Sequence, residues 1–302
     1  MTRGRANLVL LLAGAMWGMG FVAQSTAMEA IGPMLFIALR FLVAALSMLP
    51  AAIIEGRRTK RRLVASDWMN FAFIGVLLFA GMTAQQIGLE TTTVTNSGFL
   101  TGLYVVMVPF ISVLLFRQWP HPVVWPAALL ALAGIWLLSG GAIDTLRPGD
   151  WLTILCAFFW ALQVIAIGKG AAGAGRPVTL AVMQFAVCAA LAFACAIPLE
   201  RIDFGAISAA MPEILYAGIF SGGIAFTLQA IGQRYTTAPQ AAIFLSSESV
   251  FAALFGAAFL GERIGTSGFV GCALIFLAIL GVEILPAVLA ARRPPHAANS
   301  RG

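Results

Sequence analysis

Charged residues are scarce in this chain. They make up 10% of its 302 residues, whereas hydrophobic residues make up 61%. A soluble domain carries roughly 25% charged residues, and the mean hydropathy here is +0.95. This composition excludes an ordinary soluble domain and predicts a protein that lies in a lipid bilayer.

Histidine and cysteine are also rare. The two histidines are His121 and His296, and the four cysteines, none in a CxxC pair, are Cys156, Cys188, Cys195 and Cys272. Zinc sites draw on several closely spaced His or Cys ligands, so we expect neither a metal nor a cofactor. The chain also lacks the phosphate-binding motif GxxxxGK[ST] and the hydrolase motifs GxSxG and HExxH. These motifs carry ATP-dependent and hydrolytic chemistry, and their absence favours a protein that is not an enzyme.

Long apolar runs recur along the whole sequence. Each approaches the roughly 20 residues that a helix needs to cross the hydrocarbon core. Their hydrophobicity is continuous and does not alternate, which favours helices over the strands of a barrel. We therefore predict an all-α polytopic membrane protein with ten transmembrane helices, at residues 7–27, 33–54, 68–88, 95–116, 122–139, 150–170, 178–198, 212–232, 239–260 and 266–290.

The two halves of the chain resemble each other after a shift of 144 residues, as from Pro33 to Pro177. Further identical residues then coincide: Phe41 with Phe185, Gln85 with Gln229, Gly88 with Gly232 and, after a one-residue slip, Trp17 with Trp160. Each half contains five spans, and an odd number inverts the second half in the membrane. We expect two inverted five-helix repeats, at 1–145 and 146–291, followed by a tail at 292–302. Inverted repeats are typical of secondary transporters, which bind their substrate at the repeat interface.

Basic residues fall almost entirely on one side of the ten-span model. Only Arg147, Arg201 and Arg263 lie on the other side. The side rich in basic residues carries Arg3, Arg5, Arg57, Arg58, Lys60, Arg61, Arg62, Arg117, Lys169, Arg176, Arg234, Arg292, Arg293 and Arg301. Because basic loops stay in the cytoplasm, we predict a plasma or inner membrane protein with both termini cytoplasmic. The net charge of +6 thus reflects topology and does not indicate a nucleic-acid partner.

Two charged residues lie within apolar spans, where an ionisable group is costly unless it is paired or hydrated. Arg40 lies in the second span and Glu248 in the ninth. The 144-residue shift places Arg40 on Gln184 and Glu248 on Tyr104, so polar character is kept while the charge is not. This pattern suits a central site for an asymmetric solute. Two alternatives remain open: an Arg40–Glu248 ion pair, or an arginine that snorkels or bonds a backbone carbonyl.

Other polar or aromatic side chains lie at similar depths. Amides and hydroxyls there can either hydrogen-bond a solute or join helices. The candidates for solute contact are Gln24, Gln85, Gln86, Asn96, Thr101, Gln163, Gln229, Ser246, Ser247 and Ser249. Trp17 and Trp160 lie far from the interfacial belts where tryptophan is enriched, so they are candidates for the wall or gate of a cavity, with core packing as the alternative.

Several segments carry a family resemblance. Residues 96–109 (NSGFLTGLYVVMVP) and 247–254 (SESVFAAL), followed by 260–263 (LGER), resemble the fourth- and ninth-helix signatures of EamA-type members of the drug/metabolite transporter superfamily. Trp17-Gly18 and Arg40-Phe41 also fit. Ser249 departs from the usual Glu-Pro-Val, which predicts a straighter ninth helix. The resemblance covers about residues 7–290 and implies two inverted five-helix repeats and transport of a small metabolite, often outward.

The resulting hypothesis is a secondary transporter, in the export direction, for an amino-acid-like or drug-like solute. It works by alternating access around a midplane cavity formed by spans one to four and six to nine. Glu248 is the candidate for coupling to a proton; if Arg40 pairs with it, the pair becomes a latch or a site for a substrate carboxylate. The alternative is a membrane scaffold or sensor that transports nothing.

Overall fold

The structure is a computed structural model, and it describes residues 1–92, 94–138, 147–259 and 263–291. These residues form helices and no strands, as expected for a backbone that must satisfy its own hydrogen bonds in lipid. Nine helices in the described ranges are long and apolar enough to span a membrane. The tenth, shorter apolar helix is α6. The prediction of an all-α polytopic membrane protein is confirmed.

The helices follow the predicted order closely. The first half contains α1 (Arg3–Ala27), α2 (Pro33–Arg58), α3 (Ala65–Leu89), α4 (Val94–Thr101), α5 (Tyr104–Phe116) and α6 (Val124–Leu138). The second half contains α7 (Pro148–Ala174), α8 (Pro177–Leu199), α9 (Phe204–Ala209), α10 (Met211–Tyr216), the π-helix η1 (Ala217–Ile224), α11 (Ala225–Gly232), α12 (Ala238–Leu245), α13 (Ser247–Phe259) and α14 (Thr266–Ala291). The predicted boundary between the repeats, at 145 and 146, lies outside the described residues.

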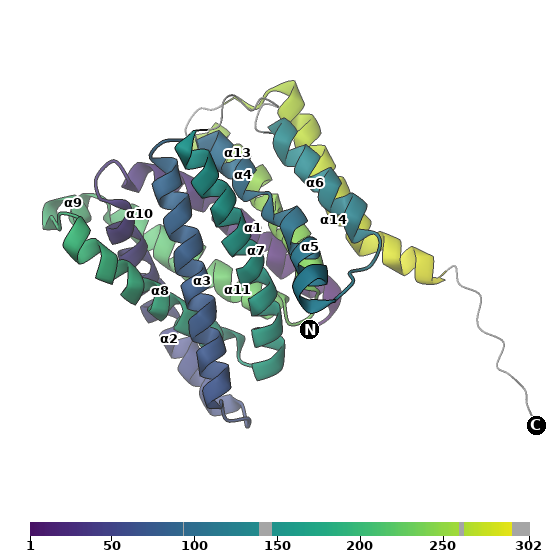
Figure 1. The fold of residues 1–302 in the computed structure, drawn as a ribbon, viewed down its shortest axis with the longest axis horizontal. Coiled ribbons are helices and arrows are strands. Elements are labelled where there is room, and N and C mark those ends of the chain that lie inside the picture. Colours follow the sequence, from purple (N-terminus) through teal and green to yellow (C-terminus); the bar gives the residue numbers. More distant parts are fainter. Residues whose placement is uncertain (93, 139–146, 260–262, 292–302) are drawn as a thin grey trace, which may run out of the picture.

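Equivalent helices of the two repeats pack in equivalent ways. α2 packs along its counterpart α8, and α6 along its counterpart α14. α3 packs along α7, and the segment equivalent to α3, from α10 through η1 to α11, packs along α1. α6 and α14 lie together at one edge of the bundle, as expected for peripheral helices (Figure 1). Each of these contacts between the repeats thus has an equivalent with the repeats exchanged, as expected for two repeats related by a pseudo-twofold axis.

Small residues allow the closest helix contacts. A Cβ added at Gly18 would lie 2.6 Å from the backbone nitrogen of Ala252 on α13, and one added at Gly218 would lie 2.9 Å from the carbonyl oxygen of Arg40 on α2. Glycine is required where membrane helices approach this closely. Gly98, by contrast, has open space around its Cβ position.

Two glutamates bind the first turns of α2 and α8. The Glu55 carboxylate, near the end of α2, accepts hydrogen bonds from the backbone N–H groups of Val178 and Thr179 (3.1 and 2.8 Å). The Glu200 carboxylate, just after α8, accepts from those of Met34 and Leu35 (both 2.8 Å). The first N–H groups of a helix lack intrahelical partners and carry positive dipole charge, so each helix stabilises the start of the other.

Three spans are irregular, which the sequence did not predict. The fourth is divided between Thr101 and Tyr104, and the ninth is divided at Ser246. The ninth is thus interrupted even though Ser249 replaces the family's proline. The eighth contains η1, a π-helix, in its middle. Discontinuous helices in transporters frequently surround the binding site, and π-helical turns also occur at functional sites.

Candidate functional site

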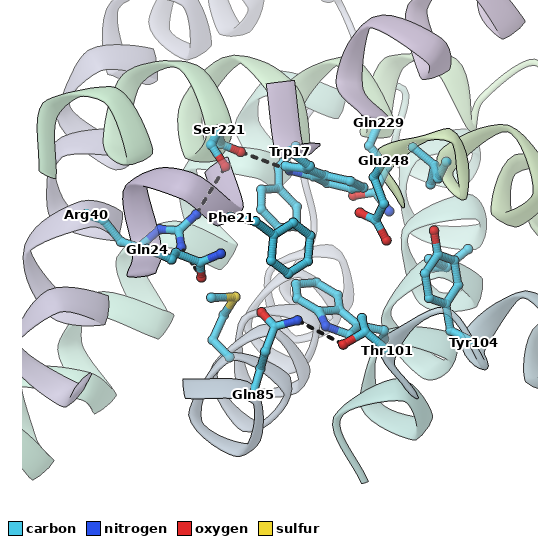
Figure 2. Close-up of a pocket in the computed structure, with 15 residues that line it drawn as sticks. Trp17, Phe21, Gln24, Arg40, Gln85, Thr101, Tyr104, Ser221, Gln229 and Glu248 are labelled. Atoms are coloured by element: carbon cyan, nitrogen blue, oxygen red, sulfur yellow. Dashed lines mark hydrogen bonds between the residues drawn. The ribbon is translucent and has the colours of Figure 1, made fainter. Parts of the chain in front are cut away.

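A cavity lies at the interface of the two repeats, in the middle of the bundle. It has a volume of about 50 Å³, taken as the space open to the centre of a water-sized sphere. One water takes roughly 10–15 Å³ by this measure, so the cavity has room for about four waters or a solute of similar size. Its lining residues are Trp17, Phe21, Gln24, Arg40, Met82, Gln85, Thr101, Tyr104, Trp160, Val164, Ser221, Phe226, Gln229, Leu245 and Glu248 (Figure 2).

The interrupted helices supply one end of the cavity. Tyr104 begins α5 directly after the break in the fourth span, and Glu248 lies in the first turn of α13 after the break at Ser246. The two residues are repeat-equivalent, and Figure 2 shows their hydroxyl and carboxylate groups on the same side of the cavity. Glu248 is 7% exposed and Tyr104 4%. The breaks therefore place a buried carboxylate and a phenol together.

Arg40 lies at the other end of the cavity and is 2% exposed. Its Nη1 donates to Gln24 Oε1 (2.9 Å), and its Nη2 donates to Ser221 Oγ (3.3 Å). The guanidinium carbon lies 5.0 Å from the centre of the Phe41 ring, an attractive cation–π distance. Its Nε has no hydrogen-bond partner among the described residues. Every contact of this cation is with a neutral group.

The predicted alternative of an Arg40–Glu248 ion pair does not occur. Within the described ranges the one ion pair joins Arg61 to Asp67 (3.1 Å), at the start of α3. Figure 2 shows Arg40 and Glu248 on opposite sides of the cavity, with Trp17 between them. The two buried ionisable groups therefore line the same cavity without contacting each other.

Aromatic rings form the wall between these two ends. The Trp17 ring centre lies 4.7 Å from that of Phe226 and 6.5 Å from that of Trp160, and Trp160 stacks on Phe226 at 5.7 Å. The Trp17 indole N–H donates to the Ser221 carbonyl oxygen (2.9 Å), which fixes the ring. Trp17 and Trp160 therefore belong both to the cavity wall and to the packed core.

Most of the sequence-predicted site residues converge on this cavity. Those that line it are Trp17, Arg40, Gln85, Tyr104, Trp160, Gln229 and Glu248, together with Gln24 and Thr101. The Gln85 amide donates to Thr101 Oγ1 (3.1 Å), so one of these side chains also joins two helices. Asn96 lies in α4, but its side chain falls outside the part of the structure that is described.

Gln163 and Gln184 differ from the expectation, because neither lines the cavity, and the same holds for Gln86, Ser246, Ser247 and Ser249. Both are fully buried, and the Gln163 amide donates to Gln184 Oε1 (3.1 Å). The Gln229 amide in turn donates to Gln163 Oε1 (3.5 Å). These amides hydrogen-bond one another, although Gln184 Nε2 and Gln229 Oε1 have no partner among the described residues. Gln184 does not line the cavity, so it does not present a second polar end equivalent to Arg40.

The sequence reasoning missed two residues that contribute to the cavity. Ser221 bonds both Arg40 and Trp17, and Phe226 contacts both tryptophans. Ser221 lies within η1 between glycines that allow close packing against α2. The run Ser221-Gly222-Gly223 inside an apolar span was the available signal. Nothing in the sequence distinguishes Phe226 from the other phenylalanines.

Comparison with known proteins relates this chain to membrane transporters. The model of the EamA-like transporter family matches residues 4–140 and 147–284. The chain is 32% identical over 279 residues to an uncharacterized transporter of Archaeoglobus fulgidus, covering 92% of this chain and 86% of that protein. It is 29% identical over 301 residues to the uncharacterized transporter YwfM of Bacillus subtilis, covering 93% and 94%.

The fold also matches a solved crystal structure. The superposition has a TM-score of 0.80 at 21% identity and covers 95% of this chain and 99% of the other. The two matched segments of the family model coincide with the two halves of the structure: the first contains four membrane-spanning helices and the shorter α6, and the second contains five membrane-spanning helices, within the described residues. The chain therefore belongs to the EamA-like transporter family, within the drug/metabolite transporter superfamily, and is a membrane transporter.

Proposed function

We propose that this protein is a secondary transporter that exports a small amino-acid-like solute by alternating access around the central cavity. One observation carries the proposal: Arg40 and Glu248 lie at opposite ends of the cavity, each without an oppositely charged partner among the described residues. Burying an unpaired charge in a membrane protein is costly. A solute carboxylate would compensate Arg40, and a solute ammonium or a proton would compensate Glu248.

The dimensions and lining favour an amino-acid-like solute over a large drug-like one. A volume of about 50 Å³ suits a molecule of few atoms. Gln24 and Ser221 already hold two nitrogens of Arg40, and its positive charge at the cavity would attract a solute carboxylate. Charge-assisted bonds of this kind are the stronger ones in proteins. The export direction follows from the family resemblance, and the placement in the plasma or inner membrane follows from the distribution of basic residues.

Counterflow in proteoliposomes tests this function. A thermal-shift screen of amino acids, matched amines lacking the carboxylate and matched acids lacking the amine would first identify a solute. We expect the intact amino acid to stabilise the protein most and to exchange across the membrane. Replacing Arg40 with glutamine should raise the apparent KM for that solute by about tenfold or more, since it removes a charge-assisted contact worth roughly 1.5–3 kcal/mol.

The matched control is Arg201→Gln, which removes the same charge from an exposed loop and should leave counterflow unchanged. Equal stabilisation by the amine and the amino acid would contradict the carboxylate role of Arg40. Absence of exchange by a correctly folded protein for every solute that binds would favour the scaffold or sensor alternative.

A further inference from the structure

A second cavity lies away from the transport site, on the face of the bundle that carries the N-terminus. It is bordered by the start of α1, the start of α6, the segment between α11 and α12, and the last part of α14. Its volume is about 390 Å³ by the measure used above, well beyond that of the central cavity. Neither the family match nor the relatives assign it a role.

Basic side chains from three separate segments line this cavity. Arg3 comes from α1, His121 from the segment before α6, and Arg234 from the segment after α11. No acidic residue lines it within the described ranges. The Arg234 guanidinium lies 5.7 Å from the neighbouring Tyr235 ring and has no ion pair in the described part of the chain. The cavity therefore presents uncompensated positive charge.

The carboxylate of Glu283 lies behind one of the lining residues, Gln240. Glu283 accepts hydrogen bonds from the amides of Asn7 and Gln240, and it does not line the cavity. The same Gln240 side chain accepts from Arg3 Nη2 (2.5 Å) through its Oε1. This chain of contacts orients Gln240 and holds Arg3 at the cavity wall, so the arginine is positioned before any ligand arrives.

The segment before α12 adds a neutral donor to the same wall. Thr236 and Thr237 line the cavity. The Thr236 hydroxyl donates to Gln240 Oε1 (2.9 Å), whereas the Thr237 side chain makes no capping hydrogen bond to the helix that it precedes. The first N–H groups of a helix lack intrahelical partners and carry positive dipole charge. Arginine side chains, hydroxyl groups and a helix N-terminus together form the environment that binds phosphate in proteins.

One side of the cavity is apolar and continues to the surface that faces lipid. Val282 and Pro286 of α14 line it. Beside them on the same helix, Ile284, Leu285 and Val288 are 50%, 46% and 39% exposed. A ligand with an anionic head and apolar chains would match both the basic wall and the apolar side of the cavity. A free anion would contact only the basic wall.

We propose that this cavity binds the phosphate group of an anionic phospholipid, with the acyl chains lying along α14. The lipid phosphate contacts Arg3 and Arg234, and the start of α12 donates further hydrogen bonds. Basic pockets between membrane helices are a recognised type of lipid headgroup site. The proposal is independent of the transported solute, because the two cavities share no lining residue.

Native mass spectrometry of the full-length protein tests the site directly. The protein in detergent is titrated with phosphatidylglycerol, with phosphatidylcholine as the zwitterionic comparison. We expect selective retention of phosphatidylglycerol by the wild type, and a loss of affinity of about tenfold or more in Arg3→Gln/Arg234→Gln, since each basic residue near the headgroup contributes about tenfold or somewhat less. The control Arg57→Gln/Arg58→Gln removes two exposed charges from the same face and should retain the lipid.

A second variant keeps the test valid if the double replacement misfolds. Thr237→Asp places a negative charge in the cavity while supplying a good N-cap residue for α12, and it should weaken phosphatidylglycerol binding without lowering thermal stability. Equal lipid retention by wild type, both cavity variants and the control would overturn the proposal. Stabilisation by inorganic phosphate, with no retention of phosphatidylglycerol, would identify a soluble anion as the ligand and overturn the lipid assignment.

Discussion

At the scale of single residues, the two buried ionisable groups differ in how the protein accommodates them. Arg40 is held by neutral hydrogen-bond acceptors and by the face of Phe41. Glu248 lies beside the phenol of Tyr104 (Figure 2). Neither arrangement includes an opposite charge from the described residues. Ionisable groups retained within the membrane usually belong to substrate or proton pathways, which is the basis of the proposed roles.

Replacing Glu248 with glutamine tests the proton-coupling role. The amide keeps the shape of the side chain but cannot bind or release a proton, so transport should lose its dependence on a pH gradient. In proteoliposomes, a gradient of one pH unit supports at most about tenfold accumulation for one proton per solute. We expect this accumulation in the wild type and none in Glu248→Gln. Counterflow without a gradient should persist in the variant, and gradient-driven accumulation that survives the replacement would remove Glu248 from the coupling role.

At the scale of helices, interruptions and caps determine where the functional groups lie. The breaks after Thr101 and at Ser246 bring Tyr104 and Glu248 to the cavity. η1 places the Ser221 hydroxyl on Arg40 and its carbonyl group on Trp17. The uninterrupted helices α2 and α8, by contrast, pack along each other, and a glutamate at the end of each accepts hydrogen bonds from the first turn of the other.

The capping glutamates give a stability prediction. Glu200→Gln removes the negative charge at the start of α2, and Glu55→Gln does so at the start of α8. Each loss should cost about 1–2 kcal/mol, which for a chain of this size lowers the Tm by roughly 2–8 °C. The two effects should add, because the sites lie at opposite ends of the helix pair.

Thermal unfolding of the purified protein in detergent measures these effects. Glu29→Gln is the matched control, since Glu29 is exposed in the segment after α1 and accepts no such bond from a helix start. A Tm of Glu200→Gln equal to that of Glu29→Gln would show that the charge at the α2 start contributes nothing to stability.

At the scale of the whole molecule, the inverted repeat explains why the cavity is central. Repeat-equivalent residues meet across the interface: Phe41 stacks on Phe185 at 5.9 Å, and Trp17 lies 6.5 Å from Trp160. Contacts between equivalent residues occur near a twofold axis. Under the proposed function, the two repeats would exchange conformations around the cavity beside these contacts, which is the principle of alternating access.

The orientation of the repeats in the membrane can be tested by labelling. From the basic residues at 57–62 we predict that the segment between α2 and α3 lies in the cytoplasm, and the segment after α8 should then lie outside. In a background without the four native cysteines, Asp203→Cys should react with a membrane-impermeant maleimide on intact cells. Lys60→Cys should react only after permeabilisation. Both positions are exposed in the structure, and labelling of Lys60→Cys on intact cells would contradict the predicted topology.

The sequence by itself determined the fold class, the ten spans and their approximate limits. It could do so because apolar length, repeat similarity and loop charge are local properties of the chain. The sequence also identified Arg40 and Glu248 as charged residues within apolar spans. Such residues can be recognised without knowledge of any tertiary contact.

Only the tertiary structure decided which polar residues reach the cavity. Gln163 and Gln184 are glutamines within apolar spans, as are Gln85 and Gln229. The first pair is hydrogen-bonded together and does not line the cavity, whereas the second pair lines it. The helix breaks, the role of Ser221 and the separation of Arg40 from Glu248 were likewise not predictable. Each depends on which helix face meets which neighbour, and that is set by packing between residues far apart in the chain.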